Sequence, residues 1–304
     1  MTVLSLIGNT SLVRLRSDPR IFLKLENENP TGSMKDRMAL AMIEAAEADG
    51  RLGPGGSVVE YTAGSTGVAL ALICAARGYR LQIVTSDAFA PEKLAHMEAL
   101  GAELHIIASH GGGMTESLTI AMVEAARKIR EDTGAFWADQ LNNPAPIAAY
   151  HAMADEIWRQ TEGQIDGFVQ SVGTAGSLRG NAERLRHHNP AIRVVAVEPA
   201  ESPVLSGGAT GAHNIDGVGA GFVVPLWRPD IADDIERVST AEAKVMAKRL
   251  AREEGLFPGT STGANVVAAV RLADRLGRNA TVVTVMCDTG MKYLHTEGTF
   301  RYLG

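Results

Sequence analysis

Lys35 is the residue whose type and position most strongly suggest chemistry. It stands in NPTGSMKDR (29–37), where a proline–glycine turn leads into a predicted helix. The lysine could contact a bound phosphate, bond covalently to a cofactor, or be a solvated surface charge. The nucleotide-binding pattern G-x-x-x-x-G-K-S/T is absent, because Lys35 follows Met34 and precedes Asp36. A helix N-terminus carries partial positive charge, which disfavours an ammonium there and favours a neutral, nucleophilic amine.

Two glycine-bearing loops follow predicted strands and open predicted helices. AGSTG (63–67) places two hydroxyls and flexible glycines at a helix N-terminus, whose free N–H groups suit a small anion such as a carboxylate. GTAGS (173–177) offers small residues, two hydroxyls and a run of main-chain donors, and is the better phosphate candidate. Each loop is also compatible with an ordinary capped helix after a tight turn.

Two further glycine loops lie later in the chain. GVGAG (217–221) lacks the last glycine of the dinucleotide pattern G-x-G-x-x-G, and we interpret it as a close-approach or hinge loop. PGTSTGAN (258–265) precedes a predicted helix, which Thr260, Ser261 or Thr262 could cap, unless one of these hydroxyls faces a ligand. Ligands of parallel α/β sheets bind where the carboxyl ends of strands meet such loops, so these loops form the candidate site.

The elements that must position these loops alternate along the chain. Short runs rich in valine and isoleucine predict strands at 21–26, 57–62, 81–86, 104–109, 168–173, 193–199 and 281–288. Segments of helical period predict helices at 34–49, 66–77, 91–100, 115–132, 146–160, 177–187, 240–254 and 264–276. Such alternation indicates parallel sheets covered by helices on both faces.

The length of 304 residues exceeds what a single core usually supports. We therefore predict an α/β protein with two lobes, each a mostly parallel, twisted sheet flanked by helices. A change in the density of strand–helix units places the smaller, mobile lobe at 40–143 and the larger lobe at 8–39 plus 144–304.

The composition is ordinary for a globular protein, with 45% hydrophobic and 21% charged residues. A net charge of −6 argues against a nucleic-acid partner. We expect no membrane partner, since no stretch approaches the roughly 20 apolar residues of a membrane span, and the N-terminus lacks the pattern of a signal peptide. Cys74 and Cys287 lie in apolar runs, which predicts buried, reduced thiols in a cytoplasmic protein and no metal cluster.

Seven motifs, in order along almost the whole chain, resemble the cysteine synthase (O-acetylserine sulfhydrylase) family. They are IGNTSLVRL (7–15), KLENENPTGSMKDR (24–37), TAGSTGVALA (62–71), VGTAGS (172–177), DGVGAGFV (216–223), GTSTGA (259–264) and DTGMKYL (288–294). This family belongs to the pyridoxal-phosphate enzymes of the tryptophan-synthase-β type. The resemblance implies pyridoxal 5'-phosphate in a cleft between the lobes, closure of the smaller lobe on the substrate, and a homodimer.

By position in these motifs, the resemblance implies the roles of particular residues. Lys35 matches the lysine that bonds covalently to the cofactor and moves the substrate's proton. The cofactor-binding residues are Lys35, Ser65, Gly173, Thr174, Ala175, Gly176, Ser177 and Ser261, and the substrate-binding residues are Thr62, Ala63, Ser65, Thr66 and Gln140. In this set, residues 173–177 match the phosphate loop and Ser261 matches the partner of the pyridine nitrogen. Gly219 matches the glycine loop at the site entrance.

The reaction expected from the resemblance is a β-replacement. The neutral Ser261 leaves the pyridine nitrogen largely unprotonated, which disfavours transamination and suits loss of a β-leaving group. Lys35 takes the α-proton, elimination gives an aminoacrylate, and sulfide or another small nucleophile adds at Cβ. We expect cysteine synthesis from O-acetylserine and sulfide.

Several alternatives remain open. The nearest are a cystathionine β-synthase and another β-substituted alanine synthase, while a serine/threonine dehydratase fits the motifs less well. A non-catalytic binding protein of the same fold is disfavoured because Lys35 and Ser261 are both present. A nucleotide-binding oxidoreductase is disfavoured by the missing dinucleotide fingerprint. Some relatives bind a serine acetyltransferase, and no feature of this sequence indicates such a partner.

The sequence departs from the usual pattern of the family at several positions. Relatives have Ser and Asn where this chain has Ala63 and Ser65, which removes one hydroxyl from the carboxylate loop and shortens the side chain that faces the cofactor. Ala175 replaces a common glycine, a mild change if its φ is negative. Cys287 stands where proline is frequent, either in contact with the cofactor or as an inert thiol. His110 is either a proton-handling group or a surface histidine.

Overall fold

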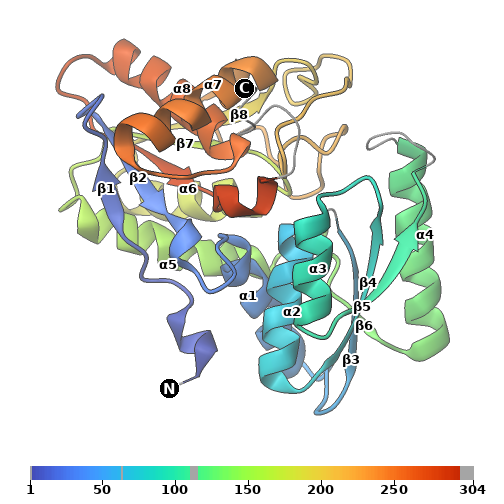
Figure 1. The fold of residues 1–304 in the computed structure, drawn as a ribbon. Coiled ribbons are helices and arrows are strands. Elements are labelled where there is room, and N and C mark those ends of the chain that lie inside the picture. Colours follow the sequence, from blue (N-terminus) through green and yellow to red (C-terminus); the bar gives the residue numbers. More distant parts are fainter. Residues whose placement is uncertain (1, 63, 110–115, 295–304) are drawn as a thin grey trace. The chain divides into compact units, whose positions relative to one another are not determined.

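The structure is a computed structural model that describes residues 2–62, 64–109 and 116–294. The chain forms two compact units. Unit 1 contains Met1–Ile7 and Lys35–Pro146, and unit 2 contains Gly8–Met34 and Ile147–Gly304 (Figure 1). Within the described residues, no helix is long and apolar enough to cross a membrane.

Unit 1 is built on a parallel four-stranded sheet with the order β5-β4-β3-β6. The strands are β3 (Ser57–Tyr61), β4 (Arg80–Ser86), β5 (Glu103–Ile107) and β6 (Phe136–Trp137). The central strands β3 and β4 are almost entirely buried, in agreement with their continuous apolar runs. The parallel pairing places the carboxyl ends of all four strands at one edge of the sheet.

The helices of unit 1 cover both faces of this sheet (Figure 1). They are α1 (Lys35–Ala48), α2 (Ser65–Arg77), α3 (Pro91–Ala99) and α4 (Glu116–Thr133), with the short η1 (Val3–Leu6) beside α2. Helices α2 and α3 lie on one face and α4 on the other. A core of Val59, Tyr61, Val84, Met122 and Ala126 fills the space under α4.

Unit 2 contains a mixed six-stranded sheet with the order β1-β2-β10-β7-β8-β9. The strands are β1 (Leu12–Arg14), β2 (Ile21–Leu25), β7 (Gly167–Ser171), β8 (Arg193–Pro199), β9 (Asp234–Val238) and β10 (Val282–Met286). Only the edge strand β1 runs antiparallel to its neighbour. The short helices η2 (Glu26–Glu28) and η4 (Gly290–Tyr293) follow β2 and β10.

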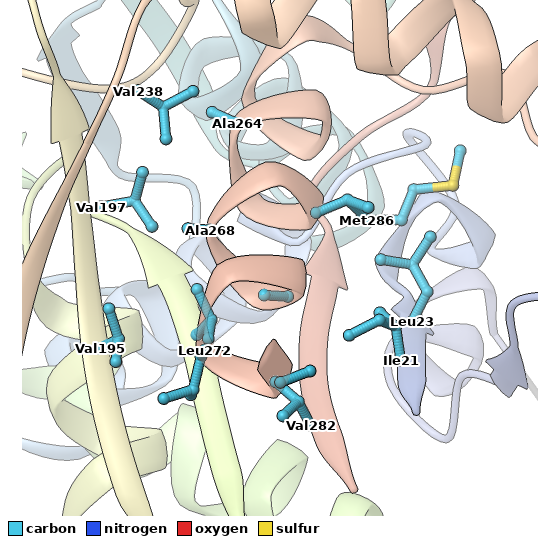
Figure 2. Packing of buried hydrophobic residues seen from close by; sticks show 14 of the residues in the cluster. Ile21, Leu23, Val195, Val197, Val238, Ala264, Ala268, Leu272, Val282 and Met286 are labelled. Atoms are coloured by element: carbon cyan, nitrogen blue, oxygen red, sulfur yellow. The ribbon is translucent and has the colours of Figure 1, made fainter. Parts of the chain in front are cut away.

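Five helical segments accompany this sheet: α5 (Ala145–Gln160), α6 (Gly176–His188), α7 (Thr240–Arg249), the π-helix η3 (Leu250–Glu254) and α8 (Thr260–Leu276). The α6 crossover leads outward from β7 to β8 and the α8 crossover leads back to β10, so right-handed connections put them on opposite faces. Figure 2 shows the core under α8, where Ala264, Ala268 and Leu272 contact strand residues such as Val195 and Val282.

The predicted α/β class, strands and helices are confirmed, with element ends displaced by up to four residues. The largest displacement matters for the site. Helix α8 begins at Thr260 with Gly259 as its N-cap, so the prediction that Thr260, Ser261 or Thr262 caps a helix starting at 264 is wrong. The predicted helix 240–254 changes to a π-helix at Leu250.

A buried ion pair fixes β2, which leads toward Lys35, against α5. Lys24 is fully buried, and its Nζ lies 2.6 Å from Oε2 of Glu156. The ammonium also donates to the carbonyl of Thr10 at 2.6 Å and to Oε1 of Gln160 at 2.9 Å. Glu156 Oε1 accepts the N–H of Asn9 at 3.0 Å. Both charges therefore have partners, which is the condition for tolerating them in an interior.

Removing one partner of this pair should be costly. Lys24→Met leaves the Glu156 carboxylate buried without its counter-charge, and we expect the free energy of unfolding to fall by about 3–5 kcal/mol in urea titrations. The double variant Lys24→Met/Glu156→Leu removes both charges and should recover most of this loss. A single variant within 1 kcal/mol of the parent protein would show that the pair does not anchor β2.

Candidate active site

In unit 1, hydrogen bonds join the loop after β3 to the segment after β6. The Thr66 hydroxyl donates to Oε1 of Gln140 at 2.8 Å, and Nε2 of Gln140 donates to the carbonyl of Tyr61 at 3.1 Å. The N–H of Gly64 donates to the Thr62 hydroxyl at 3.1 Å. The structure thus brings Thr62, Thr66 and Gln140 together, with Ser65 between the two threonines. Ala63 lies outside the described residues.

Glu60 anchors this arrangement and was missed by the sequence analysis. It is fully buried in β3, and its Oε2 accepts the N–H of Gln140 at 3.2 Å while Oε1 accepts the N–H of Tyr61 at 3.1 Å. Burial raises the pKa of Glu60 to about 8, although these backbone donors oppose the shift. The signal in the sequence is a lone acid inside an apolar strand, SVVEYT (57–62).

The first turn of α2 has N–H groups available for an anion. Its N-cap, Gly64, makes no side-chain capping bond, and its φ of +155° is one that favours glycine. A helix N-terminus without a side-chain cap combines free donors with partial positive charge. The geometry therefore suits a carboxylate at residues 62–66.

In unit 2, the phosphate-loop candidate connects β7 to α6. The residue before the helix, Ala175, provides no side-chain cap, and Thr174 makes no hydrogen bond with the described residues. The Ser177 hydroxyl lies 2.8 Å from Nε2 of Gln170, whose donation leaves the serine proton available for an anion. A Cβ on Gly173 would stand 2.5 Å from the carbonyl oxygen of Gly217, which confirms the close approach predicted for loop 217–221.

Ala175 itself has a φ of +68° and ψ of −15°, in the left-handed region. The condition under which we expected a mild change, a negative φ, is therefore not met. A residue with a Cβ costs about 1–2 kcal/mol in this conformation, and only 3% of Ala175 is exposed. Gly219 also has a positive φ, +64°, and its N–H donates to the carbonyl of Val172 at 2.9 Å, so the two glycine loops hold each other.

Backbone pairing fixes the residues that lead directly into Lys35. The N–H of Met34 donates to the carbonyl of Cys287 at 2.9 Å, and the N–H of Thr289 donates to the carbonyl of Gly32 at 3.0 Å. The Tyr150 hydroxyl donates to the carbonyl of Met34 at 3.0 Å. Lys35 follows as the first residue of α1, in agreement with its expected place in a first helical turn. The peptide before the lysine therefore has both its N–H and C=O groups committed.

The same segment after β10 holds the start of α8. The N–H of Gly259 donates to the carbonyl of Asp288 at 3.2 Å, and the N–H of Cys287 donates to the Thr262 hydroxyl at 3.1 Å. The second of these bonds is unavailable to a proline, which has no N–H. Between these contacts lies Ser261, which is 5% exposed and makes no side-chain hydrogen bond with the described residues. Its hydroxyl is available for a ligand.

Cys287 and Cys74 are buried, free thiols, as predicted. Nδ2 of Asn265 lies 3.4 Å from Sγ of Cys287 and donates to the carbonyl of Val285 at 2.8 Å. Oδ1 of Asn265 accepts the N–H of Ser171 at 2.7 Å, so one amide ties together the carboxyl ends of β7 and β10. Contact of Cys287 with the cofactor stays a prediction, and His110 lies outside the described residues.

These donor sets fit pyridoxal phosphate. The uncapped first turn of α6 with Thr174 and Ser177 suits a phosphate dianion. The neutral Ser261 hydroxyl suits a pyridine nitrogen, and Lys35 supplies a primary amine. The tight passage at Gly173, where a Cβ would meet backbone, is the kind of close approach that a cofactor-binding loop needs.

Comparison with known proteins decides the family. The family model described as "Pyridoxal-phosphate dependent enzyme" matches residues 3–288. The chain belongs to this family of pyridoxal-phosphate-dependent enzymes. It is 40% identical over 301 residues to a cysteine synthase of Staphylococcus aureus (strain Mu50), an alignment that covers 97% of this chain and 95% of the relative. The cofactor and the enzymatic nature of the chain are thereby established.

Solved structures of the family agree with this assignment. A cysteine synthase from Entamoeba histolytica is 36% identical with a TM-score of 0.91, covering 99% of this chain and 91% of that chain. An O-acetylserine-dependent cystathionine β-synthase from Helicobacter pylori is 32% identical with a TM-score of 0.91, covering 99% of both chains. The two-sheet α/β fold of this pyridoxal-phosphate enzyme is therefore that of its relatives.

The left-handed conformation of Ala175 leads to a graded prediction. Ala175→Gly relieves backbone strain of about 1 kcal/mol but loses a buried methyl of similar value, so the unfolding free energy should stay within about 0.5 kcal/mol of the parent. Ala175→Val places a β-branched residue at positive φ and should cost at least about 2 kcal/mol and weaken pyridoxal-phosphate binding. Urea unfolding and a cofactor titration measure both effects. A valine variant as stable as the parent would exclude the strained conformation.

Proposed function

We propose that this pyridoxal-phosphate enzyme catalyses β-replacement on an activated serine, forming cysteine from O-acetylserine and sulfide. The observation that carries the proposal is Ser261, a neutral hydroxyl that is buried, free of side-chain bonds to the described residues, and placed at the start of α8. A neutral partner of the pyridine nitrogen suits β-elimination rather than transamination. The cysteine synthase of Staphylococcus aureus at 40% identity supports the same reaction.

The proposed roles follow the donor sets. Lys35 holds the cofactor covalently and moves the proton of the substrate. The phosphate is held by Gly173, Thr174, Ala175, Gly176 and Ser177, and the cofactor ring by Ser65 and Ser261. The substrate carboxylate is bound by Thr62, Ala63, Ser65, Thr66 and Gln140. Support comes from the uncapped starts of α2 and α6 and from the bond between Thr66 and Gln140.

When bound, pyridoxal phosphate withdraws electrons and stabilises negative charge at the substrate Cα. The loop 62–66 and Gln140 fix the carboxylate, which sets the orientation of the Cα–H bond toward its base. The Lys35 amine accepts that proton, acetate leaves Cβ with its bonding electrons, and sulfide forms the new bond at Cβ. Lys35 then returns the proton to Cα, so the chain ends the cycle unchanged.

A second candidate is cystathionine β-synthesis, in which a larger thiol replaces sulfide. The observation that favours it is the O-acetylserine-dependent cystathionine β-synthase of Helicobacter pylori, which matches 99% of this chain. Another β-substituted alanine synthase would share the first half of the reaction. Mass spectrometry of the products formed from O-acetylserine with sulfide and homocysteine in competition separates these candidates, and cysteine should dominate.

The loss of Lys35 should stop the reaction. We expect Lys35→Ala to lower turnover of O-acetylserine and sulfide by at least about 10³-fold, since both the covalent anchor and the base are removed. Its circular dichroism and thermal unfolding should match those of the parent. Lys128→Ala, which changes a lysine that is 76% exposed, is the matched control and should keep full activity. Activity of the Lys35 variant within tenfold of the parent would remove Lys35 from this role.

The assembly and location of the enzyme belong to the same proposal. We propose a cytoplasmic homodimer whose 40–143 lobe moves on substrate binding, as the family resemblance implies. Light scattering at micromolar concentration should give twice the 32.2 kDa of one chain. A mass of one chain under these conditions would contradict the dimer.

A further inference from the structure

A buried cation lies against the loop 62–66, and none of the seven family motifs contains it. Lys93 is in the first turn of α3 and is only 4% exposed. A Cβ built on Gly64 would stand 2.3 Å from Cδ of Lys93, 3.1 Å from Cε and 3.2 Å from Nζ. The lysine side chain therefore runs against the backbone of Gly64 and ends beside it.

The sheet explains why these two residues meet. Strands β3 and β4 are parallel neighbours, so the segments that follow them begin at the same edge. The N–H of Thr62 continues the pairing by donating to the carbonyl of Val84 at 3.0 Å. Helices α2 and α3 start from these segments and lie side by side on one face (Figure 1). Their N-termini are therefore presented together at the carboxyl edge of the sheet.

The electrostatics of this arrangement favour an anion. The N-terminus of α2 carries partial positive charge and has no side-chain cap. Lys93 places a full positive charge at the same point, although an ammonium in the first turn of α3 interacts unfavourably with the dipole of its own helix. A carboxylate bound at this loop interacts favourably with the helix N-terminus and with the ammonium. Burial reduces the screening of this interaction by water.

We propose that Lys93 is a specificity-determining residue for the amino-acid substrate: its ammonium charges the loop 62–66 and strengthens binding of the substrate's α-carboxylate. The inference rests on the proposed function, which assigns the carboxylate to that loop. It also explains the glycine at position 64, because any side chain there would occupy the space of the lysine stem. The positive charge offsets the hydroxyl that Ala63 lacks relative to the family pattern.

The test compares two ligands that differ only in charge at the carboxyl group. L-alanine carries the amine and the carboxylate without a β-leaving group, and L-alaninamide carries a neutral amide in its place. Equilibrium dissociation constants are measured by calorimetry for the parent, Lys93→Met and Lys128→Met, each loaded with pyridoxal phosphate. Lys93→Met keeps the apolar stem against Gly64 and removes the charge, while Lys128→Met removes an exposed charge from the same unit.

We expect Lys93→Met to raise the dissociation constant of L-alanine about tenfold, which corresponds to about 1.4 kcal/mol. The constant for L-alaninamide should change less than twofold, as should the affinity for pyridoxal phosphate and both constants of Lys128→Met. If circular dichroism shows that Lys93→Met is unfolded, Lys93→Gln removes the same charge with a polar end and is read in the same way.

Two results would overturn the inference and are distinguishable. Unchanged L-alanine binding in Lys93→Met, or an equal loss for both ligands, would exclude a charge-specific role of Lys93 and leave the proposed function standing. A parent enzyme that binds L-alanine no more tightly than L-alaninamide would contradict the carboxylate loop itself, and Lys93 with it.

Discussion

The site of unit 2 depends on a backbone segment, residues 287–290, that is hydrogen-bonded on two sides. On one side it pairs with residues 32–34, which lead into Lys35, and on the other with residues 257–259, which lead into Ser261. Each such bond contributes about 0.5–1.5 kcal/mol net, and together they define one position for both flanking segments. The segment follows β10, a central strand that parallel neighbours hold on both sides.

This dependence on the backbone explains why unusual side chains are tolerated there. Gly32 has a φ of +72°, and a Cβ at that position would stand 2.7 Å from Cγ2 of Thr289, so the turn before Lys35 requires glycine. Cys287, in contrast, faces no such restriction, and its N–H gains the Thr262 hydroxyl as a partner. The position of the reactive lysine is thus encoded by a glycine turn and a strand end rather than by contacts of the lysine itself.

In unit 1 the equivalent constraint is a buried carboxyl. Glu60 accepts the N–H of Gln140, whose side chain in turn accepts from Thr66, so a chain of bonds runs from the core of β3 to the carboxylate loop. Desolvation raises the pKa of Glu60 to about 8, which shows that the fold accepts an energetic penalty at this point. An unfavourable group retained inside a strand is best explained by the loop that it positions.

The sequence predicted the strand–helix alternation and the glycine loops well, because continuous apolar runs and helical periodicity are local signals. It missed β6, which has two residues, and β9, DIERV, whose charged residues hide a strand paired only on one side. It also missed Glu60 and Lys93, because their meaning comes from parallel strands that bring distant loops to one edge. The sign of φ at Ala175 likewise depends on the packing of loop 173–177 and not on the residue type.

The central claim is that Lys35 is the covalent anchor of pyridoxal phosphate. The most direct measurement is to load the protein with the cofactor, reduce the carbon–nitrogen bond with borohydride, and locate the modified lysine by peptide mass mapping. The account predicts one cofactor per chain, attached to the peptide that contains Lys35. Attachment to another lysine, such as Lys93 or Lys292, or no attachment at all, would contradict it.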